Sequence, residues 1–397
     1  MSFIPNKIIL WAVDDFNSLG VIRQLGNQGL DLLFLIKGNA NIAAKSKYCT
    51  HYIETETLQD GYNYLLTNFS NEKIKPIILL SGDDTMTFVD QHRSSLSPLF
   101  LLPGSKTEGI VTKYTDKNNM TSLAEKLGFL SPKSFYIKKD SLIDDIIYPC
   151  IIKPSHERPG HYNEFKYKIC KDQLQLRYTL SLVNPESQFI VQQYIPKEKD
   201  ILIYGLRLQS GEVILAGAFI KNRLSADASG SFGYITNKIP IYIDAELITK
   251  FLCHIDYYGL FSFEYGVVGD KAYFFEVNLR NDGTSHYFYQ LGANLPLAYI
   301  YDASGQDIYN IQTKVTQCGW FIDELFDIEN LLMGKLSYKQ WKTDKEKATV
   351  YKYYDKDDMI PYQIIKKNQL KLLFVHLMLK YFRVQIIYIL DKMGLKK

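Results

Sequence analysis

The chain has 397 residues, more than the roughly 250–300 that one hydrophobic core usually supports, so two or three domains are expected. Its 46 Lys and Arg residues nearly balance its 43 Asp and Glu residues, and the net charge of +3 excludes the broad positive field with which many proteins gather nucleic acid. The five cysteines lie far apart, with no CxxC pair and no zinc-type spacing, which indicates reduced thiols in a cytosolic protein.

The first apolar run of the chain is short. It covers about 8–13 and ends at Asp14 and Asp15, which is too short for the core of a signal peptide or for a membrane span. We therefore expect the protein to be cytoplasmic.

The N-terminal part of the chain is expected to contain a parallel sheet. Continuous apolar runs predict strands over 7–13 and 32–36, and helical spacing is present over 17–29 between them. A strand, a helix and a second strand in this order form a parallel β-α-β unit.

A further predicted strand, 76–80, ends in the sequence SGDD. Ligands bind at the carboxyl edge of such sheets, which makes Ser81, Asp83 and Asp84 candidates for a site. Two Asp residues after a strand are also common as plain helix caps, and this alternative stays open.

The pattern changes after residue 113. A helix is predicted over 116–127, where Gly128 and then Pro132 end it, and this segment is interpreted as a linker into a new domain. The short apolar runs that follow indicate an α+β region with much antiparallel sheet, with strands over 150–153, 189–193, 201–208, 213–220, 260–267 and 272–277.

The segment 260–283 carries the clearest chemical signal, whereas the chain lacks both GxxxxGK[ST] and GxGxxG. Two apolar strands joined by a GDK turn each contain one carboxylate, Glu264 and Glu276. Because side chains alternate along a strand, Glu276, Asn278 and Arg280 share a face, and the hairpin places Glu264 beside them. Two carboxylates and an amide oxygen among apolar neighbours favour a bound cation, for which Mg²⁺ is suitable. The alternative is an ordinary hairpin whose charged side is solvated.

This segment resembles the metal-binding signature of the ATP-grasp superfamily, and the resemblance covers roughly residues 1–305. It implies an α/β and α+β protein with a Rossmann-like domain over 1–112, which precedes an ATP-grasp domain over 113–305. The latter would contain a small lid at about 130–195 and an antiparallel catalytic sheet. Residues 306–397 would be a C-terminal extension.

The resemblance also implies an ATP site with Mg²⁺, or Mn²⁺ in its place. Glu264, Glu276 and Asn278 would hold the metal, and Lys117 and Lys153 would hold the phosphates. The strand FIVQQYI and the sequence after it would supply the adenine and ribose contacts, namely Gln192, Gln193, Ile195 and Asp200. Gln192 and Gln193 point to opposite faces because they are neighbours on a strand, and the resemblance favours Gln192.

Three basic residues are expected to act on the reacting groups. Arg280 would offset charge that develops on the transferred phosphoryl group. Lys221 and Arg223 resemble basic residues that the superfamily places near the phosphate and the acceptor, although a pair of exposed bases is an equally good interpretation. The loop SHERPGHYNEF departs from the usual Gly-rich lid, and His156, Arg158 and His161 are either phosphate contacts or structural residues. The small-residue loop 225–234 is a candidate for close approach to the triphosphate.

The implied activity is that of an ATP-dependent ligase, which activates a carboxylate as an acyl phosphate and transfers the acyl group to an amine or similar nucleophile. The stretch after RNDG resembles short ATP-grasp proteins of bacterial surface-polysaccharide gene clusters, which suggests a sugar acid or an amino acid as substrate. The alternatives are an ATP-grasp kinase, a carboxyphosphate-forming enzyme, and a non-catalytic nucleotide-binding scaffold at the membrane. A homodimer is a further expectation, and nucleic acid is not an expected partner.

The C-terminal extension ends in a basic apolar helix, predicted over about 368–393. One side of its helical wheel is polar and most of the remainder is apolar. Its charges argue against a spanning helix. Two alternatives remain: the apolar face packs on the body of the protein, or the helix makes a peripheral contact with the inner face of the membrane.

Overall fold

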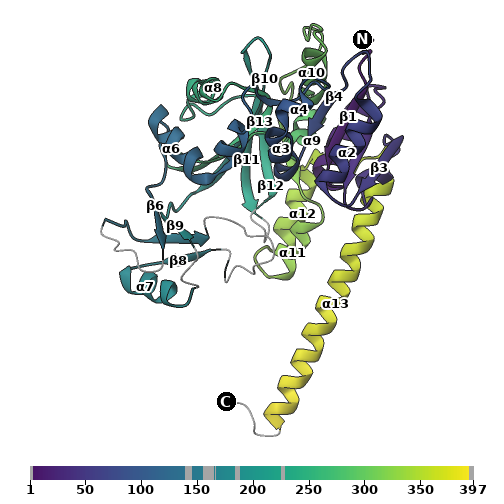
Figure 1. Cartoon of the computed structure of the whole chain (residues 1–397). Helices are drawn as coiled ribbons and strands as arrows, with labels where there is room; N and C mark the ends of the chain where they lie inside the picture. Colours follow the sequence, from purple (N-terminus) through teal and green to yellow (C-terminus); the bar gives the residue numbers. More distant parts are fainter. Residues whose placement is uncertain are drawn as a thin grey trace.

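The computed structural model describes residues 3–138, 145–154, 165, 167–183, 188–224 and 229–392. Within these residues the strands form three sheets, which Figure 1 shows in a compact body from which one long helix extends. The mixed α/β and α+β class expected from the sequence is confirmed.

The first sheet is parallel, with strand order β3-β2-β1-β4. Its central strand β1 (Ile8–Ala12) is buried along its whole length, as its continuous apolar sequence requires. Helix α1 (Phe16–Gly26) follows at once because Asp15 and Ser18 form a capping box. The remaining elements of this domain are β2 (Leu33–Lys37), 3₁₀ helix η1 (Ala43–Lys45), β3 (His51–Thr55), α2 (Leu58–Phe69), β4 (Ile77–Leu80), α3 (Asp83–Gln91) and α4 (Arg93–Leu96).

The largest sheet, mainly antiparallel, has the order β14-β13-β10-β11-β12-β15-β16, and β5 pairs with β13 outside this path. The strand bounds are β5 (Gly104–Ser105), β10 (Lys199–Arg207), β11 (Val213–Leu224), β12 (Gly230–Thr236), β13 (Tyr257–Val268), β14 (Lys271–Asn278), β15 (Gly319–Ile322) and β16 (Val350–Tyr351). The part of the predicted extension from 319 to 351 therefore adds two strands to this sheet, which periodicity did not reveal because both strands are very short.

Helices cover this sheet and connect it to the rest of the body (Figure 1). They are α5 (Ile110–Thr115), α6 (Lys117–Leu127), α8 (Ala245–His254), α9 (Ser285–Gln290), α10 (Leu295–Ala303), α11 (Phe326–Leu332) and α12 (Tyr338–Lys347). Two large apolar clusters fill the layers. One includes Leu10, Tyr204 and Phe288, and the other includes Trp11, Phe251 and Phe263.

The third sheet has the order β6-β9-β7-β8 and lies within the segment that was expected to be the lid. Its strands are β6 (Ser134–Lys138), β7 (Cys150–Pro154), β8 (Lys168–Cys170) and β9 (Gln188–Gln193), and α7 (Gln173–Ser181) packs beside them. It has an apolar core of its own around Cys150, Ile152 and Val191.

Buried polar contacts join the parallel sheet to the loop after β14. The Asn17 amide donates to the main-chain oxygens of Ser81 and Asn281, at 2.8 and 3.0 Å. The Asn281 amide in turn donates to Asn17 Oδ1 at 2.6 Å and accepts from the Tyr204 hydroxyl at 2.7 Å. Gly283 follows, and a side chain at this position would clash with the Phe16 ring. The RNDG sequence is thus a structural junction between two sheets.

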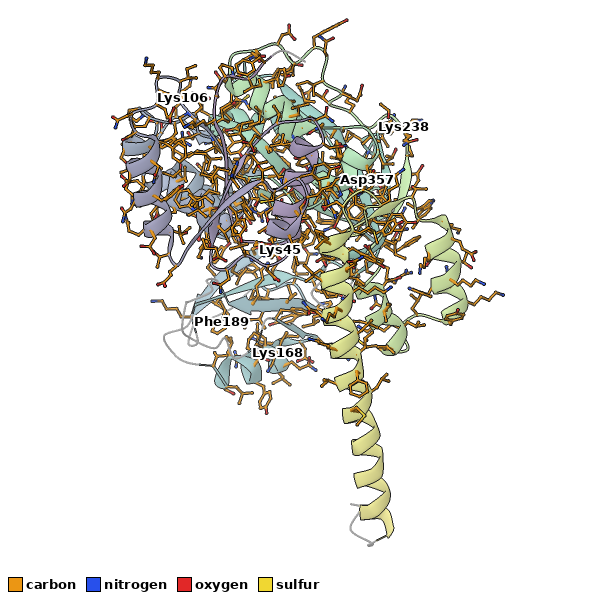
Figure 2. All side chains as sticks on the ribbon, turned by 90° about the vertical axis from the view of Figure 1, so that its right-hand side faces the viewer. Lys45, Lys106, Lys168, Phe189, Lys238 and Asp357 are labelled. Carbon is orange, nitrogen blue, oxygen red and sulfur yellow. The ribbon has the colours of Figure 1, made fainter. Side chains whose placement is uncertain are left out.

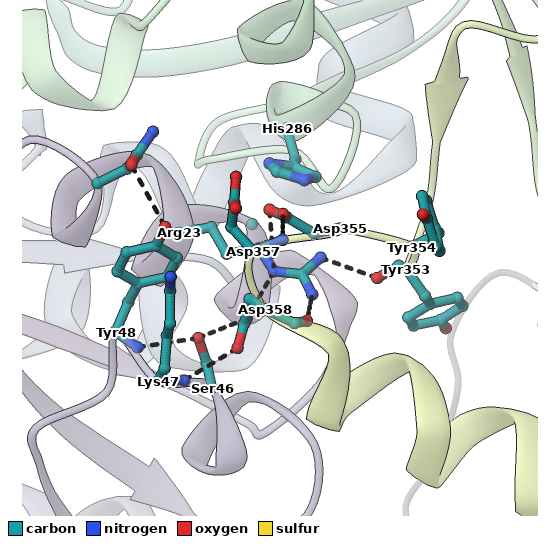
Figure 3. A network of polar contacts seen from close by, with 12 residues as sticks. Arg23, Ser46, Lys47, Tyr48, His286, Tyr353, Tyr354, Asp355, Asp357 and Asp358 are labelled. Atoms are coloured by element: carbon teal, nitrogen blue, oxygen red, sulfur yellow. Dashed lines mark hydrogen bonds and ion pairs between the residues drawn. The ribbon is translucent and has the colours of Figure 1, made fainter.

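A second junction holds the root of the C-terminal helix α13 (Met359–Lys392) (Figure 3). The buried Arg23 guanidinium donates to Asp358 Oδ2 at 2.9 Å and to the main-chain oxygens of Tyr353 and Asp358. Ser46 Oγ and the Lys47 amide donate to the same carboxylate. The helix begins nine residues earlier than predicted, because Pro361 lies in its first turn, where the missing amide proton costs nothing. No helix within the described residues is long and apolar enough to span a membrane.

Candidate active site

The two predicted metal carboxylates lie opposite each other. In the antiparallel pairing of β13 with β14, Glu264 is the direct partner of Glu276. Side chains at such positions are neighbours on the same face of the sheet. Burial raises the pKa of Glu276, and the negative charge of Glu264 raises it further. Two adjacent carboxylates in this environment require positive charge, which is what a cation site supplies.

Asn278 is oriented by its neighbours. Its amide nitrogen donates to Ser262 Oγ at 3.1 Å, and Ser262 donates to Asp282 Oδ2 at 3.0 Å. The Asn278 oxygen accepts a 3.3 Å contact from Arg280. The side-chain oxygen of Asn278 therefore stays on the face that Arg280 shares, as strand alternation predicted.

Lys221 lies on β11, which is separated from β13 by β10, and its side chain reaches the carboxylate pair. Its Nζ lies 3.0 Å from Glu264 Oε2, and its side chain is only 9% exposed. Burial lowers the pKa of Lys221, but the attraction and hydrogen bond of Glu264 outweigh it and leave the pKa raised. Lys221 is therefore a charged residue at the edge of the pair, next to Asp200, its strand partner on β10.

The two predicted phosphate lysines come from different elements. Lys117 is the first residue of α6, and Lys153 lies on β7 of the small sheet. Burial, and then the positive charge of Lys117, lower the pKa of Lys153 to about 8, while Glu276 acts in the opposite direction. Lys117 and Glu276 both act on the pKa of Lys153, so the three side chains lie within electrostatic range of one another.

The predicted adenine strand positions Lys153. Gln192 is buried and accepts from Lys153 Nζ at 3.3 Å, while its own amide donates to Ser134 Oγ at 2.8 Å. Gln193 contributes its main chain, which donates to the Lys133 oxygen. Ile195 is buried, and Asp200 forms an ion pair with Lys197.

The residues present fit a magnesium ion that is completed by phosphate oxygens. The described residues contain no group of three or more His, Cys, Asp or Glu side chains that could hold a metal on their own. Two carboxylates and one amide oxygen leave coordination positions open, as Mg²⁺ sites that also bind phosphate do. Burial and the neighbouring Glu264 raise the pKa of Glu276, and a bound cation would offset both effects.

Comparison with known proteins identifies the fold of the chain. No family model matches the chain. An N5-carboxyaminoimidazole ribonucleotide synthetase in complex with ADP superposes with a TM-score of 0.65 at 14% identity, over 84% of this chain and 86% of that one. The Staphylococcus aureus N5-carboxyaminoimidazole synthetase with ADP gives a TM-score of 0.64 at 14% identity, over 84% and 87%. The chain has the ATP-grasp fold.

Two further comparisons extend this result. The Bacillus licheniformis L-amino acid ligase has the same fold, with a TM-score of 0.60 at 14% identity over 79% of each chain. By sequence, the formate-dependent phosphoribosylglycinamide formyltransferases of Sulfurisphaera tokodaii and Sulfolobus acidocaldarius are each 27% identical over 150 residues, which is 35% of this chain. The match spans just over a third of the length of these curated relatives, 37%.

Within the ATP-grasp fold, Arg223 lies apart from the other basic residues. Its guanidinium donates to both oxygens of Asp327, at 2.7 and 2.6 Å, and to Asp344 at 2.8 Å. The pairing of β11 with β12 shifts register between Lys221 and Arg223, so the two bases are not equivalent positions on one regular strand. Arg223 therefore connects β11 to α11 and α12, a placement that differs from the expected one beside the transferred phosphate.

Sequence reasoning did not single out Ser262 and Asp282, which orient Asn278. Ser262 lies two residues before Glu264 on the same strand, so the alternation that selected Glu264 also points to it. Asp83, one of the two Asp residues after β4, binds Arg280 through both carboxylate oxygens, at 2.6 and 2.9 Å. The candidates His156, Arg158 and His161, and part of the loop 225–234, lie outside the described residues.

Proposed function

We propose that this ATP-grasp protein is an ATP-dependent ligase that joins a carboxylate to an amine through an acyl phosphate. The observation that carries the proposal is that three basic residues act electrostatically on the Glu264–Glu276 pair or on one another beside it. They are Lys117 at the start of α6, Lys153 on the small sheet and Arg280 after β14. The names of the neighbours support it, because they include an L-amino acid ligase and carboxyaminoimidazole synthetases.

Each residue of the site has a role in this proposal. Lys117 and Lys153 would bind the phosphate oxygens of ATP, with Gln192 holding the Lys153 ammonium in place. Glu264, Glu276 and Asn278 would hold Mg²⁺ or Mn²⁺, which when bound neutralises charge on the β- and γ-phosphates. Arg280 would offset the charge that accumulates as the substrate carboxylate attacks the γ-phosphorus. Lys221 would hold the Glu264 carboxylate in place, because the two form a close pair.

The substrate class follows from resemblance. The stretch after RNDG is similar to ATP-grasp proteins of surface-polysaccharide gene clusters, so we propose a sugar acid or an amino acid as the carboxylate. A cytoplasmic location agrees with five cysteines that form no disulfide.

A paired substrate screen tests this function. Amino acids and uronic acids are combined with amino acids and amino sugars, and ADP and phosphate release is followed by mass analysis of the product. We expect one pair to give ADP, phosphate and an amide product, and Glu276→Gln to give none. Release of ADP without any condensed product would contradict the proposal.

The second candidate is an enzyme that forms carboxyphosphate from bicarbonate. The similarity to carboxyaminoimidazole synthetases and to a biotin carboxylase domain crystallised with MgADP and bicarbonate favours this alternative. Bicarbonate would then stimulate ADP release in the absence of a carboxylic acid substrate. If bicarbonate has no effect and an organic acid does, the ligase proposal stands.

A further inference from the structure

The C-terminal helix is attached to the body only near its root. Tyr362, Ile364 and Ile365 pack against the large apolar cluster that also contains Leu10 and Phe288, and the Arg23–Asp358 contacts fix the chain just before the helix begins. Beyond these turns α13 extends away from the body, which Figure 1 and Figure 2 show from two directions at right angles. At about 1.5 Å per residue, its 34 residues make a rod on the order of 50 Å long.

The helix exposes an apolar stripe. Leu370, Phe374 and Leu377 are 56%, 65% and 52% exposed, and Val375 and Met378 are also exposed. Phe374, Leu377 and Met378 follow Leu370 by four, seven and eight residues, which places all four along one side of the helix. A contiguous apolar surface of this kind on a soluble protein marks a contact site.

The charge of the chain is divided unevenly between this helix and the body. Helix α13 carries six of the 46 Lys and Arg residues and one of the 43 Asp and Glu residues, and the rest of the chain, with 40 basic and 42 acidic residues, is net acidic. Lys366, Lys367 and Lys371 adjoin the exposed stripe at its root end. A basic and apolar surface on an otherwise acidic protein is complementary to an anionic layer that also offers an apolar interior.

We propose that α13 is a docking helix for anionic membranes, with its apolar stripe in the headgroup region and its lysines on acidic lipid. Two copies of the same strongly basic helix would repel each other, which disfavours self-association through this stripe. Phe374, Leu377 and Met378 have no partner surface on the body among the described residues, as their exposure shows. The fixed root would then hold the ATP-grasp body close to the membrane.

Vesicle flotation of the full chain tests the proposal directly. Vesicles of phosphatidylcholine alone are compared with vesicles of equal parts phosphatidylcholine and phosphatidylglycerol. We expect binding to the anionic vesicles that is about a hundredfold tighter than to the neutral ones and that weakens with salt.

Two double variants separate the two parts of the surface. Phe374→Asp with Leu377→Asp should abolish flotation, and Lys367→Glu with Lys371→Glu should weaken it more than about tenfold. Matched controls on exposed sites elsewhere, Leu174→Asp with Ile241→Asp and Lys126→Glu with Lys250→Glu, should bind as the parent does. All these sites are exposed, so folding should be retained, and circular dichroism checks it.

Three results would overturn the proposal. The full chain could ignore anionic vesicles, or bind neutral and anionic vesicles equally. It could also form, in light scattering without lipid, an oligomer that the Phe374→Asp, Leu377→Asp variant dissolves, which would assign the stripe to a second copy of the chain. None of these measurements depends on catalytic activity, so they are independent of the proposed ligase function.

Discussion

Arg280 and Asp83 form a bidentate ion pair between two sheets of the protein. Arg280 follows β14, while Asp83 begins α3 after the parallel strand β4, and the two hydrogen bonds measure 2.6 and 2.9 Å. The Arg280 side chain is 16% exposed and that of Asp83 is 56% exposed. Burial alone lowers the pKa of Arg280, and the hydrogen bonds to Asp83 raise it. The parallel-sheet domain thus sets the direction of the arginine at the candidate active site.

Asp83→Asn should therefore impair turnover without changing ATP affinity. The neutral amide loses one acceptor and the charge assistance, so Arg280 is held less firmly, and the loss of about 1.5–3 kcal/mol corresponds to a roughly ten- to hundredfold fall in kcat. Steady-state ADP release and calorimetric titration with ATP measure the two quantities. Asp84→Asn is the control, since Asp84 pairs with Lys37 and not with Arg280. Equal losses in both variants would contradict a positioning role for Asp83.

Glu276→Gln should raise stability while it removes activity. Because burial and Glu264 raise the pKa of Glu276 in the folded state, its ionised form is disfavoured there, and folding stability is reduced above that pKa. The glutamine variant should therefore melt at a higher temperature at neutral pH without nucleotide. This gain should disappear as the pH falls toward the ordinary carboxyl pKa of 4.5, where the wild-type residue is protonated in both states.

Glu264→Gln should shift the melting temperature in the opposite direction. Glu264 pairs with the buried Lys221, so its removal leaves that ammonium without a partner and should lower the melting temperature. Both variants should lose turnover by orders of magnitude, since each removes one of the two carboxylates proposed to hold the metal. Equal thermal shifts in the two variants would show that their electrostatic environments do not differ as described.

ATP affinity should fall above about pH 8. Burial, and then Lys117, lower the pKa of Lys153 to about 8, so the protein without nucleotide loses this positive charge as the pH rises through that value. Phosphate binding favours the protonated form, so affinity should decrease up to about tenfold per pH unit above it. Lys153→Met should bind ATP about 1.5–3 kcal/mol more weakly at pH 7 and show a flatter pH profile. Identical profiles for both proteins, measured by calorimetry, would place the phosphates elsewhere.

Lys117→Met extends this test to the second phosphate lysine. It should also weaken ATP binding, and removal of its charge should raise the pKa of Lys153. The pH at which affinity begins to fall should accordingly move upward. An unchanged midpoint would mean that the two lysines do not act on the same site.

Arg223→Met should destabilise the fold. Asp327 and Asp344 are buried, and without Arg223 both carboxylates lose their principal cation, which typically costs about 3–5 kcal/mol. Denaturant unfolding measures the change. If Arg223→Met unfolds as the parent does but loses turnover, the residue acts on substrate as the sequence suggested.

The sequence predicted those parts of the site that depend on strand periodicity. Glu264, Glu276 and Asn278 were selected because they alternate along two neighbouring strands, and the register of β13 with β14 confirms that Glu264 and Glu276 are partners. The preference for Gln192 over Gln193 came from resemblance. Local sequence does not encode contacts between distant segments. The partners of Arg223 lie more than a hundred residues later, in a segment without clear periodicity, and a register shift separates Arg223 from Lys221.

The start of the C-terminal helix was also missed. It was predicted at about residue 368, whereas α13 begins at Met359 and contains Pro361 in its first turn. The contacts that hold this turn come from Arg23, more than three hundred residues earlier in the chain. Periodicity within the helix could not reveal them, because they depend on the tertiary fold.

Trapping with hydroxylamine tests the central claim most directly. The enzyme is incubated with ATP, Mg²⁺, the carboxylate substrate and hydroxylamine in place of the amine, and the hydroxamate is measured together with ADP and phosphate. The proposed acyl phosphate predicts equal amounts of all three products and none with Glu276→Gln. AMP and pyrophosphate as products, or a phosphorylated product that hydroxylamine leaves intact, would contradict a ligase that acts through an acyl phosphate.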